Sequence, residues 1–79
     1  MADYTVAKTL DYKGLACPMP IVKISQEIGK VAVGDVLEVH TTDPGSLVDF
    51  PAWAKTTGNA ILESKREPNV IKIFVKRQK

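Results

Sequence analysis

The residues with the clearest chemical potential lie in the stretch Leu15-Ala16-Cys17-Pro18-Met19-Pro20, which holds the only cysteine of the 79-residue chain. Pro18 suits the first position of a helix, where its fixed φ fits and its missing N–H would lack a partner anyway. This predicts Cys17 as the helix cap, with Pro20 at the third helical position. The positive end of a helix dipole favours a thiolate, and the thiolate is the nucleophilic form of cysteine.

Two interpretations of Cys17 stay open on local chemistry. In the first, Cys17 is a reactive thiol, although the prolines remove two N–H groups from the helix start, so the site positions the sulfur more than it activates it. In the second, Cys17 packs as a small apolar residue at the head of a helical apolar stripe. The members of that stripe are Cys17, Ile21, Ile24 and Ile28.

Other motifs give weaker indications of chemistry. One cysteine and one histidine provide no ligand cluster for structural zinc, so we expect no metal and no other cofactor. His40 is expected on the polar side of a strand rather than as a catalytic base. The stretch Asp43-Pro44-Gly45-Ser46 is expected to begin a helix, because it lacks the glycine and lysine spacing of a phosphate-binding loop. The sequence contains no Ser-His-Asp or Cys-His-Asp pattern, so we predict no hydrolase site.

Composition favours one small globular domain covering residues 1–79. The chain is 44% hydrophobic and 25% charged, and its net charge of +2 is too small to indicate nucleic acid as a partner. A single cysteine forms no internal disulfide, and the N-terminus lacks the apolar core of a secretory signal. No apolar run approaches the roughly 20 residues that span a bilayer. We therefore expect a cytoplasmic protein that does not enter a membrane.

The elements that must position Cys17 follow from hydrophobic periodicity. Alternation over residues 4–12 predicts a first strand, and isoleucines at helical spacing predict a helix over residues 18–30. After a turn at Gly34-Asp35, alternation over Val36–Thr41 predicts a second strand. Such a unit has parallel strands and a right-handed crossover. The apolar face of the first strand is expected to hold Tyr4, Val6, Leu10 and Tyr12.

The second half of the chain adds a helix and a hairpin. Asp43 is expected as the helix cap with Pro44 at the first position, and Pro51 predicts a break into two pieces, 44–49 and 51–57. Strands at 60–66 and 70–76, joined by a turn at 67–69, predict a β-hairpin. The order βαβαββ predicts an α/β (α+β) two-layer sandwich, with both helices on one face of a four-stranded mixed sheet. The packed side of the second helix is expected to hold Leu47, Phe50, Trp53 and Ala54.

Taken together, these residues resemble the TusA/SirA-like family of small prokaryotic sulfur-carrier proteins. The resemblance covers nearly the whole chain. It implies a two-layer sandwich similar to the C-terminal domain of a bacterial translation initiation factor. Some relatives have a further cysteine in the second helix, where this chain has Trp53-Ala54. The motifs that carry the resemblance are Leu10-Asp11, Gly14-Leu15, Cys17-Pro18-Met19-Pro20, Gly34-Asp35, Thr42-Asp43-Pro44 and Asp49-Phe50-Pro51.

The resemblance also implies a function. In such proteins the cysteine of the C-P-x-P motif carries sulfur as a persulfide or a thiosulfonate and passes it to a partner. Carried over, the sulfur-carrying residue is Cys17, and its supports are Pro18, Met19 and Pro20. The implied partners are cysteine desulfurases, rhodanese-type proteins or DsrE-like proteins.

A lone nucleophile without a general base or an oxyanion hole fits a stoichiometric carrier better than an enzyme. The alternative is a non-catalytic binding module, either a regulator that acts through protein contacts or an RNA binder that uses the basic end from Lys72 to Lys79. An RNA-binding module should survive Cys17→Ser and bind with a steep salt dependence.

Overall fold

A computed structural model of the protein describes residues 5–16 and 18–79, and within these ranges the element order is βαβαββ, as predicted. A short 3-10 turn, η1, continues the first helix. The elements are β1 (Val6–Asp11), α1 (Met19–Glu27), η1 (Ile28–Lys30), β2 (Val36–Thr41), α2 (Ser46–Thr57), β3 (Ala60–Glu67) and β4 (Val70–Lys76).

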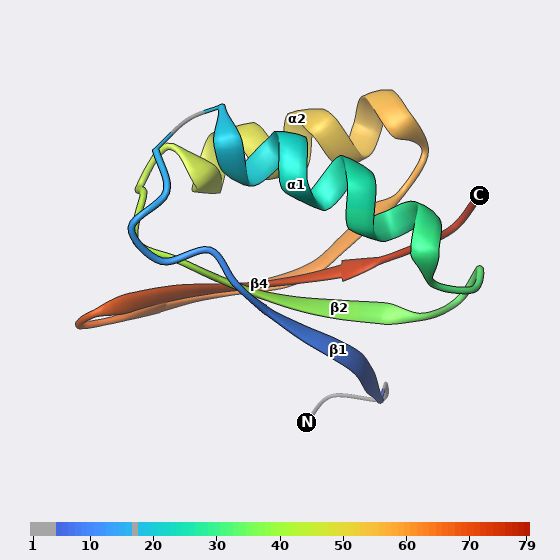
Figure 1. The fold of residues 1–79 in the computed structure, drawn as a ribbon, viewed down its shortest axis with the longest axis horizontal. Helices are drawn as coiled ribbons and strands as arrows, with labels where there is room; N and C mark the ends of the chain where they lie inside the picture. Colours follow the sequence, from blue (N-terminus) through green and yellow to red (C-terminus); the bar gives the residue numbers. More distant parts are fainter. Residues whose placement is uncertain (1–4, 17) are drawn as a thin grey trace.

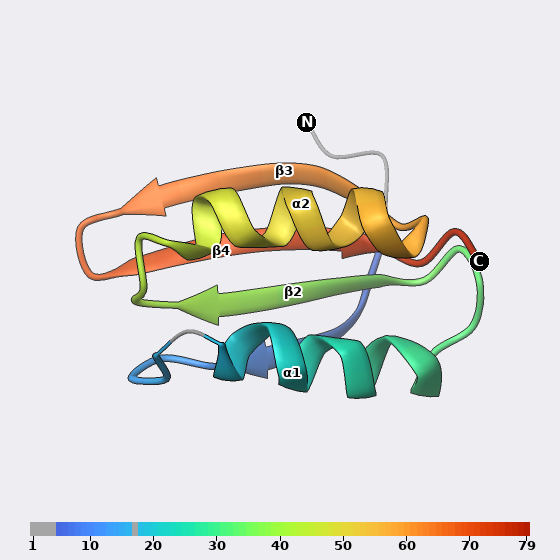
Figure 2. The ribbon, with the colours of Figure 1, turned by 90° about the horizontal axis from the view of Figure 1, so that it is seen from above.

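The strands form a mixed sheet in the order β1-β2-β4-β3. Strands β1 and β2 are parallel, and β4 lies antiparallel to both β2 and β3. Figures 1 and 2 show both helices on one face of this sheet, which confirms the predicted two-layer arrangement. Each helix follows one of the two parallel strands and returns across the sheet, so the helices also run parallel. Both helices therefore begin at the same end of the molecule, beside the carboxyl ends of β1 and β2.

The core lies between the helices and the sheet. Ile24 of α1 and Phe50 of α2 are completely buried. Trp53 joins the two helices, because its Nε1 donates a hydrogen bond of 2.8 Å to Ser25 Oγ and its ring meets the Phe50 ring edge-on at 6.3 Å. The predicted packed side of α2 is thus confirmed. The sheet contributes the fully buried side chains of Leu37, Val39, Ile73 and Val75.

Strand β1 is shorter than predicted. It covers Val6–Asp11, and Tyr4 falls outside the described residues. Leu10 is buried as expected, and so is Tyr12, whose N–H still donates to the His40 carbonyl of β2 at 2.7 Å. The strand is irregular at its start, where the pairing register with β2 shifts between Val6 and Lys8.

The predicted break at Pro51 is wrong, because α2 is one helix that contains this proline. Pro51 is exposed, whereas Phe50, Trp53 and Ala54 are buried. The Leu47 carbonyl, which would accept the N–H that proline lacks, can therefore turn toward water. Burial of the opposite face holds the helix together through the interruption.

The predicted start of this helix is also corrected. The cap residue is Gly45 rather than Asp43, and the helix begins at Ser46 rather than Pro44. A turn precedes it, in which the Ser46 N–H donates to the Asp43 carbonyl at 3.0 Å. Asp43 still acts as a local cap, since its Oδ1 accepts the Gly45 N–H at 2.9 Å. The chain thus enters α2 through a turn that the aspartate stabilises.

Replacing Pro51 by alanine is expected to stabilise the protein by about 1 kcal/mol or more. Alanine restores an N–H for the Leu47 carbonyl and removes the ring, and this gain exceeds the stiffening that proline gives the unfolded chain. Urea denaturation checks the change in free energy of unfolding. Pro68→Ala, in the hairpin turn, is the control. If Pro51→Ala were no more stable than the wild type, the proline would not destabilise the helix at this position.

Candidate functional site

The stretch around Cys17 lies where β1 ends and α1 begins. Cys17 itself lies outside the described residues, but its sequence neighbours Ala16 and Pro18 are both exposed. The Met19 N–H donates to the Ala16 carbonyl at 2.9 Å, and the Val22 N–H donates to the Pro18 carbonyl at 3.0 Å. Ala16 and Met19 are thus joined by a turn that leads directly into the first turn of α1.

The cap of α1 is Pro18, not Cys17 as predicted, and the helix begins at Met19. Pro18 has φ −96° and ψ 13°, outside the helical region, so helical geometry starts one residue later than expected. Pro20 accordingly stands at the second helical position and not the third. Pro20 is buried while Pro18 and Met19 are exposed, so Pro20 anchors the start of the helix in the core.

The loop that precedes Cys17 is tied to the rest of the protein. Gly14 has φ +83°, a conformation that favours glycine, and its N–H donates to Thr42 Oγ1 at 3.0 Å. The Leu15 N–H donates to the Tyr12 carbonyl at 3.2 Å. These bonds connect the loop after β1 to the loop after β2. The β2–α2 loop is therefore a structural support of the candidate site.

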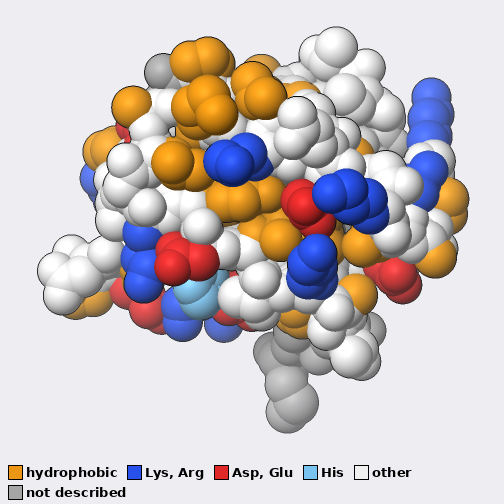
Figure 3. Space-filling view, in the orientation of Figure 1, with side chains coloured by type: hydrophobic (Ala, Val, Ile, Leu, Met, Phe, Trp, Pro, Cys, Tyr) orange, Lys and Arg blue, Asp and Glu red, His pale blue; other side chains and the backbone are white. Residues whose placement is uncertain are grey.

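An apolar surface lies at the end of the molecule where both helices begin. Met19 and Val22 of α1 are 42% and 41% exposed, and Val48 in the first turn of α2 is 72% exposed. Figure 3 shows apolar side chains gathered over this part of the helix layer. The prediction of the site missed Val22 and Val48. The sequence does contain a pattern that indicates their exposure, because both are apolar residues outside the buried stripes of their helices.

Tyr12, directly before the loop, has a buried hydroxyl that finds no hydrogen-bond partner within the described ranges. Burial and, second, the negative charge of Glu27 raise the pKa of Tyr12 to about 12. Hydrogen bonds from Lys8 and Lys30 to Glu27 lower the pKa of that carboxyl group. The Tyr12 hydroxyl therefore stays protonated near neutral pH and does not serve as a base.

Tyr12→Phe is expected to leave stability at pH 7 unchanged or higher, because it removes a buried hydroxyl that makes no hydrogen bond to the described residues. In the wild type the raised pKa means that the folded state holds this proton more tightly. The stabilisation of the folded state by this tighter proton binding is fully present below pH 10 and is lost as the pH rises toward about 12. The variant should lose less stability over that interval in urea denaturation. A marked loss of stability at pH 7 would reveal a bonded hydroxyl.

The open face of the sheet carries charges of both signs. His40 is half-buried there, as a strand histidine whose Nε2 lies 2.5 Å from Glu38 Oε2. Lys72 pairs with Glu67 at 3.4 Å. These two pairs place acidic side chains beside basic ones on this face. Within the described ranges, no group of three acidic, histidine or cysteine residues could hold a metal, and no helix is long and apolar enough to cross a membrane.

The chain is similar to known proteins over most of its length. The family model described as "Sulfurtransferase TusA" matches residues 8–77. The sulfur carrier protein TusA of Allochromatium vinosum is 43% identical over 77 residues, which cover 98% of this chain and 99% of that protein. YrkI of Bacillus subtilis is 43% identical over 70 residues, 89% of this chain and 93% of that protein.

Two further similarities concern length and fold. YrkF of Bacillus subtilis is 47% identical over 68 residues, which cover 86% of this chain but only 37% of the longer protein. The crystal structure of a SirA-like protein from Desulfitobacterium hafniense matches with a TM-score of 0.78 at 20% identity. That match covers 91% of this chain and 99% of the other, so the two proteins share one fold.

Proposed function

Since this chain belongs to the TusA family, we propose that it is a sulfur carrier protein and that Cys17 is the residue that carries the sulfur. The observation that carries the proposal is the similarity, over nearly the full length of both chains, to a protein named as a sulfur carrier. Cys17 and its prolines fall within the matched range of 8–77.

The transfer step needs no outside oxidant or reductant. The Cys17 thiolate attacks the outer sulfur of a donor persulfide, a new S–S bond forms, and the donor leaves as a thiolate. The same exchange in the other direction passes the sulfur to an acceptor thiolate. With a thiosulfonate cargo, the thiolate attacks a polythionate such as tetrathionate, and thiosulfate leaves.

The surroundings of the cysteine support this role. Ala16 and Pro18 are exposed, and Pro20 fixes the helix start in the core. The positive end of α1 favours the anionic form of a persulfide. Exposed Met19 and Val22 give the site an apolar border, which suits contact with a partner protein.

We propose a stoichiometric carrier and not an enzyme, because a carrier needs one nucleophile while its partners supply the acid, the base and the specificity. The partners proposed are a cysteine desulfurase, a rhodanese-type protein or a DsrE-like protein. The cytoplasm is the proposed location, since a reducing compartment keeps a lone thiol available for loading.

Loading tests the proposal directly. The reduced protein is incubated with a cysteine desulfurase and cysteine, with a rhodanese and thiosulfate, or with tetrathionate, and its intact mass is measured. We expect an adduct of about 32 Da for a persulfide or about 112 Da for a thiosulfonate, removed by reductant. Absence of an adduct from all three donors would reject the sulfur-carrier function.

A further inference from the structure

The β3–β4 hairpin extends past the end of β2, and this overhang creates a pocket that the proposed sulfur transfer does not use. The last pair between β2 and β4 is Thr41 with Ile71, whereas β3 and β4 stay paired as far as Glu67 with Val70. Beyond Thr41 the chain turns away from the sheet toward α2. A pocket of about 320 Å³ lies between that loop and the hairpin.

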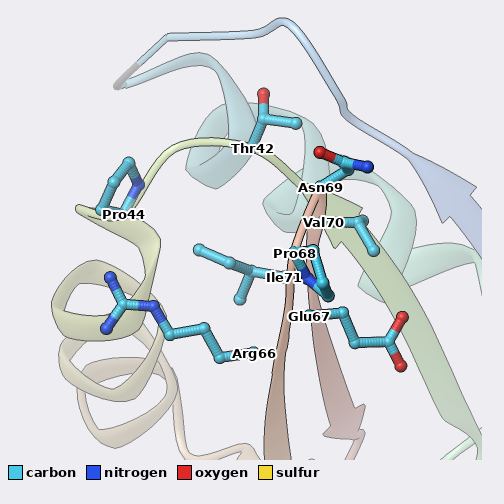
Figure 4. A pocket seen from close by; sticks show the side chains of 8 residues that line it. All are labelled: Thr42, Pro44, Arg66, Glu67, Pro68, Asn69, Val70 and Ile71. Atoms are coloured by element: carbon cyan, nitrogen blue, oxygen red, sulfur yellow. The ribbon is translucent and has the colours of Figure 1, made fainter.

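The pocket wall is mixed, with polar side chains from Thr42, Arg66, Glu67 and Asn69 and apolar side chains from the other lining residues. Pro44 comes from the β2–α2 loop, and Pro68, Val70 and Ile71 come from the hairpin. Figure 4 shows Ile71 pointing into the space between Pro44 and the Arg66 side chain. Because these residues come from segments far apart in the sequence, no local pattern predicts the pocket.

One positive charge at the rim, that of Arg66, has no partner among the residues that the structure describes. Arg66 is exposed, and its guanidinium group makes no ion pair or hydrogen bond with any other residue that the structure describes. Glu67, the acidic group of the lining, pairs with Lys72 at 3.4 Å and points away from Arg66 (Figure 4). The pocket therefore combines a partly apolar wall with a cation that presents several N–H donors and has no partner among the described residues.

We propose that this pocket binds a carboxylate attached to an apolar body, with Arg66 holding the carboxylate and Ile71 and Pro44 contacting the apolar part. Planar guanidinium groups bind carboxylates through paired hydrogen bonds. Such a ligand is either a free branched-chain acid or the carboxyl end of a polypeptide with an apolar last residue. The chemistry of recognition is the same for both sources.

The pocket is connected to the loop that precedes Cys17. Thr42 lines the pocket, and its Oγ1 accepts the Gly14 N–H at 3.0 Å. Occupation of the pocket is therefore expected to change the environment of the Gly14 amide. Binding itself does not depend on sulfur at Cys17, so the test of this pocket is independent of the test of the carrier function.

The test is an NMR titration of the ¹⁵N-labelled, reduced protein with 4-methylpentanoate at constant ionic strength. We expect saturable shifts of the Asn69, Val70 and Gly14 amides. The neutral amide of the same acid should bind more weakly because it lacks the negative charge. Inorganic sulfate should also bind more weakly because it lacks the apolar body. A peptide ending in leucine, with a free or an amidated carboxyl group, distinguishes a chain end from a free acid as the source.

Arg66→Gln should weaken binding at least about fivefold, as expected for loss of a charge-assisted hydrogen bond at an exposed site. Lys55→Gln is the matched control, because it removes the same charge from the last turn of α2, at the far end of that helix. If Arg66→Gln and Lys55→Gln weakened binding equally, the affinity would come from general charge attraction, and the proposal would be overturned. Failure of both the acid and the free-carboxyl peptide to shift these amides would also overturn it.

Discussion

Cys17→Ser is expected to take no sulfur adduct from any donor and to pass no sulfur to an acceptor, while its fold stays intact. Serine keeps the size of the side chain but replaces the sulfur that forms the S–S bond. Its sequence neighbours Ala16 and Pro18 are exposed, so the free energy of unfolding should change by less than about 1 kcal/mol. Intact mass after loading and urea denaturation measure the two effects.

Val33→Ala is the control for this variant, because it changes a 61% exposed apolar residue beyond the C-terminal end of α1 and keeps the thiol. It should load as the wild type does. A Cys17→Ser protein that still gained the adduct would place the sulfur on another group. A large loss of stability in Cys17→Ser would favour the open interpretation of this cysteine as a packed core residue.

Phe50→Ala is expected to lower the free energy of unfolding by about 3–5 kcal/mol, the range for truncating a buried phenylalanine. Phe50 is completely buried at the middle of α2, and its ring packs edge-on against Trp53. Proteins of this size bury little surface and have little stability to lose. The variant should therefore be largely unfolded at 37 °C by circular dichroism, with tryptophan fluorescence shifted toward that of exposed indole.

Val48→Ala provides the comparison within the same helix. Val48 is 72% exposed, so its truncation should change stability by no more than about 0.5 kcal/mol. Similar effects of the two substitutions would contradict the assignment of Phe50 to the core and Val48 to the surface.

The sequence predicted the sheet and its helices well, because alternate residues of the two central strands, β2 and β4, form the face that the helices cover. Leu37 and Val39 in β2, and Ile73 and Val75 in β4, are completely buried, as the period of two requires. The chain order of these patterns then leaves few ways to pair the strands. The family predicted from the order of the motifs is also confirmed by the match over residues 8–77.

The errors occur where a local rule competes with tertiary packing. Pro51 was expected to divide α2, but the ring lies on the exposed face and the buried side chains opposite keep the helix continuous. At the start of α1, the rule for proline at the first position failed by one residue because Pro18 has a non-helical ψ. Helix boundaries are the features that local rules specify least well.

The site could be predicted only in part. The stretch from Cys17 to Pro20 was identified by residue type and spacing, and its assignment as the sulfur site remains a prediction. The pocket at Arg66 could not be predicted, since it exists only where the hairpin overhangs the end of β2. The support that Thr42 gives the loop at Gly14 likewise depends on two parallel strands ending side by side.

The most direct test of the carrier function is handover of labelled sulfur. The protein is loaded with ³⁵S from a persulfide donor, freed of that donor, and mixed with an excess of a candidate acceptor such as a DsrE-like or rhodanese-type protein. The account predicts that label leaves Cys17 and appears on the acceptor in equal amount, and that Cys17→Ser transfers none. Label that stays on the protein with every acceptor, or that reaches the acceptor equally well through Cys17→Ser, would contradict it.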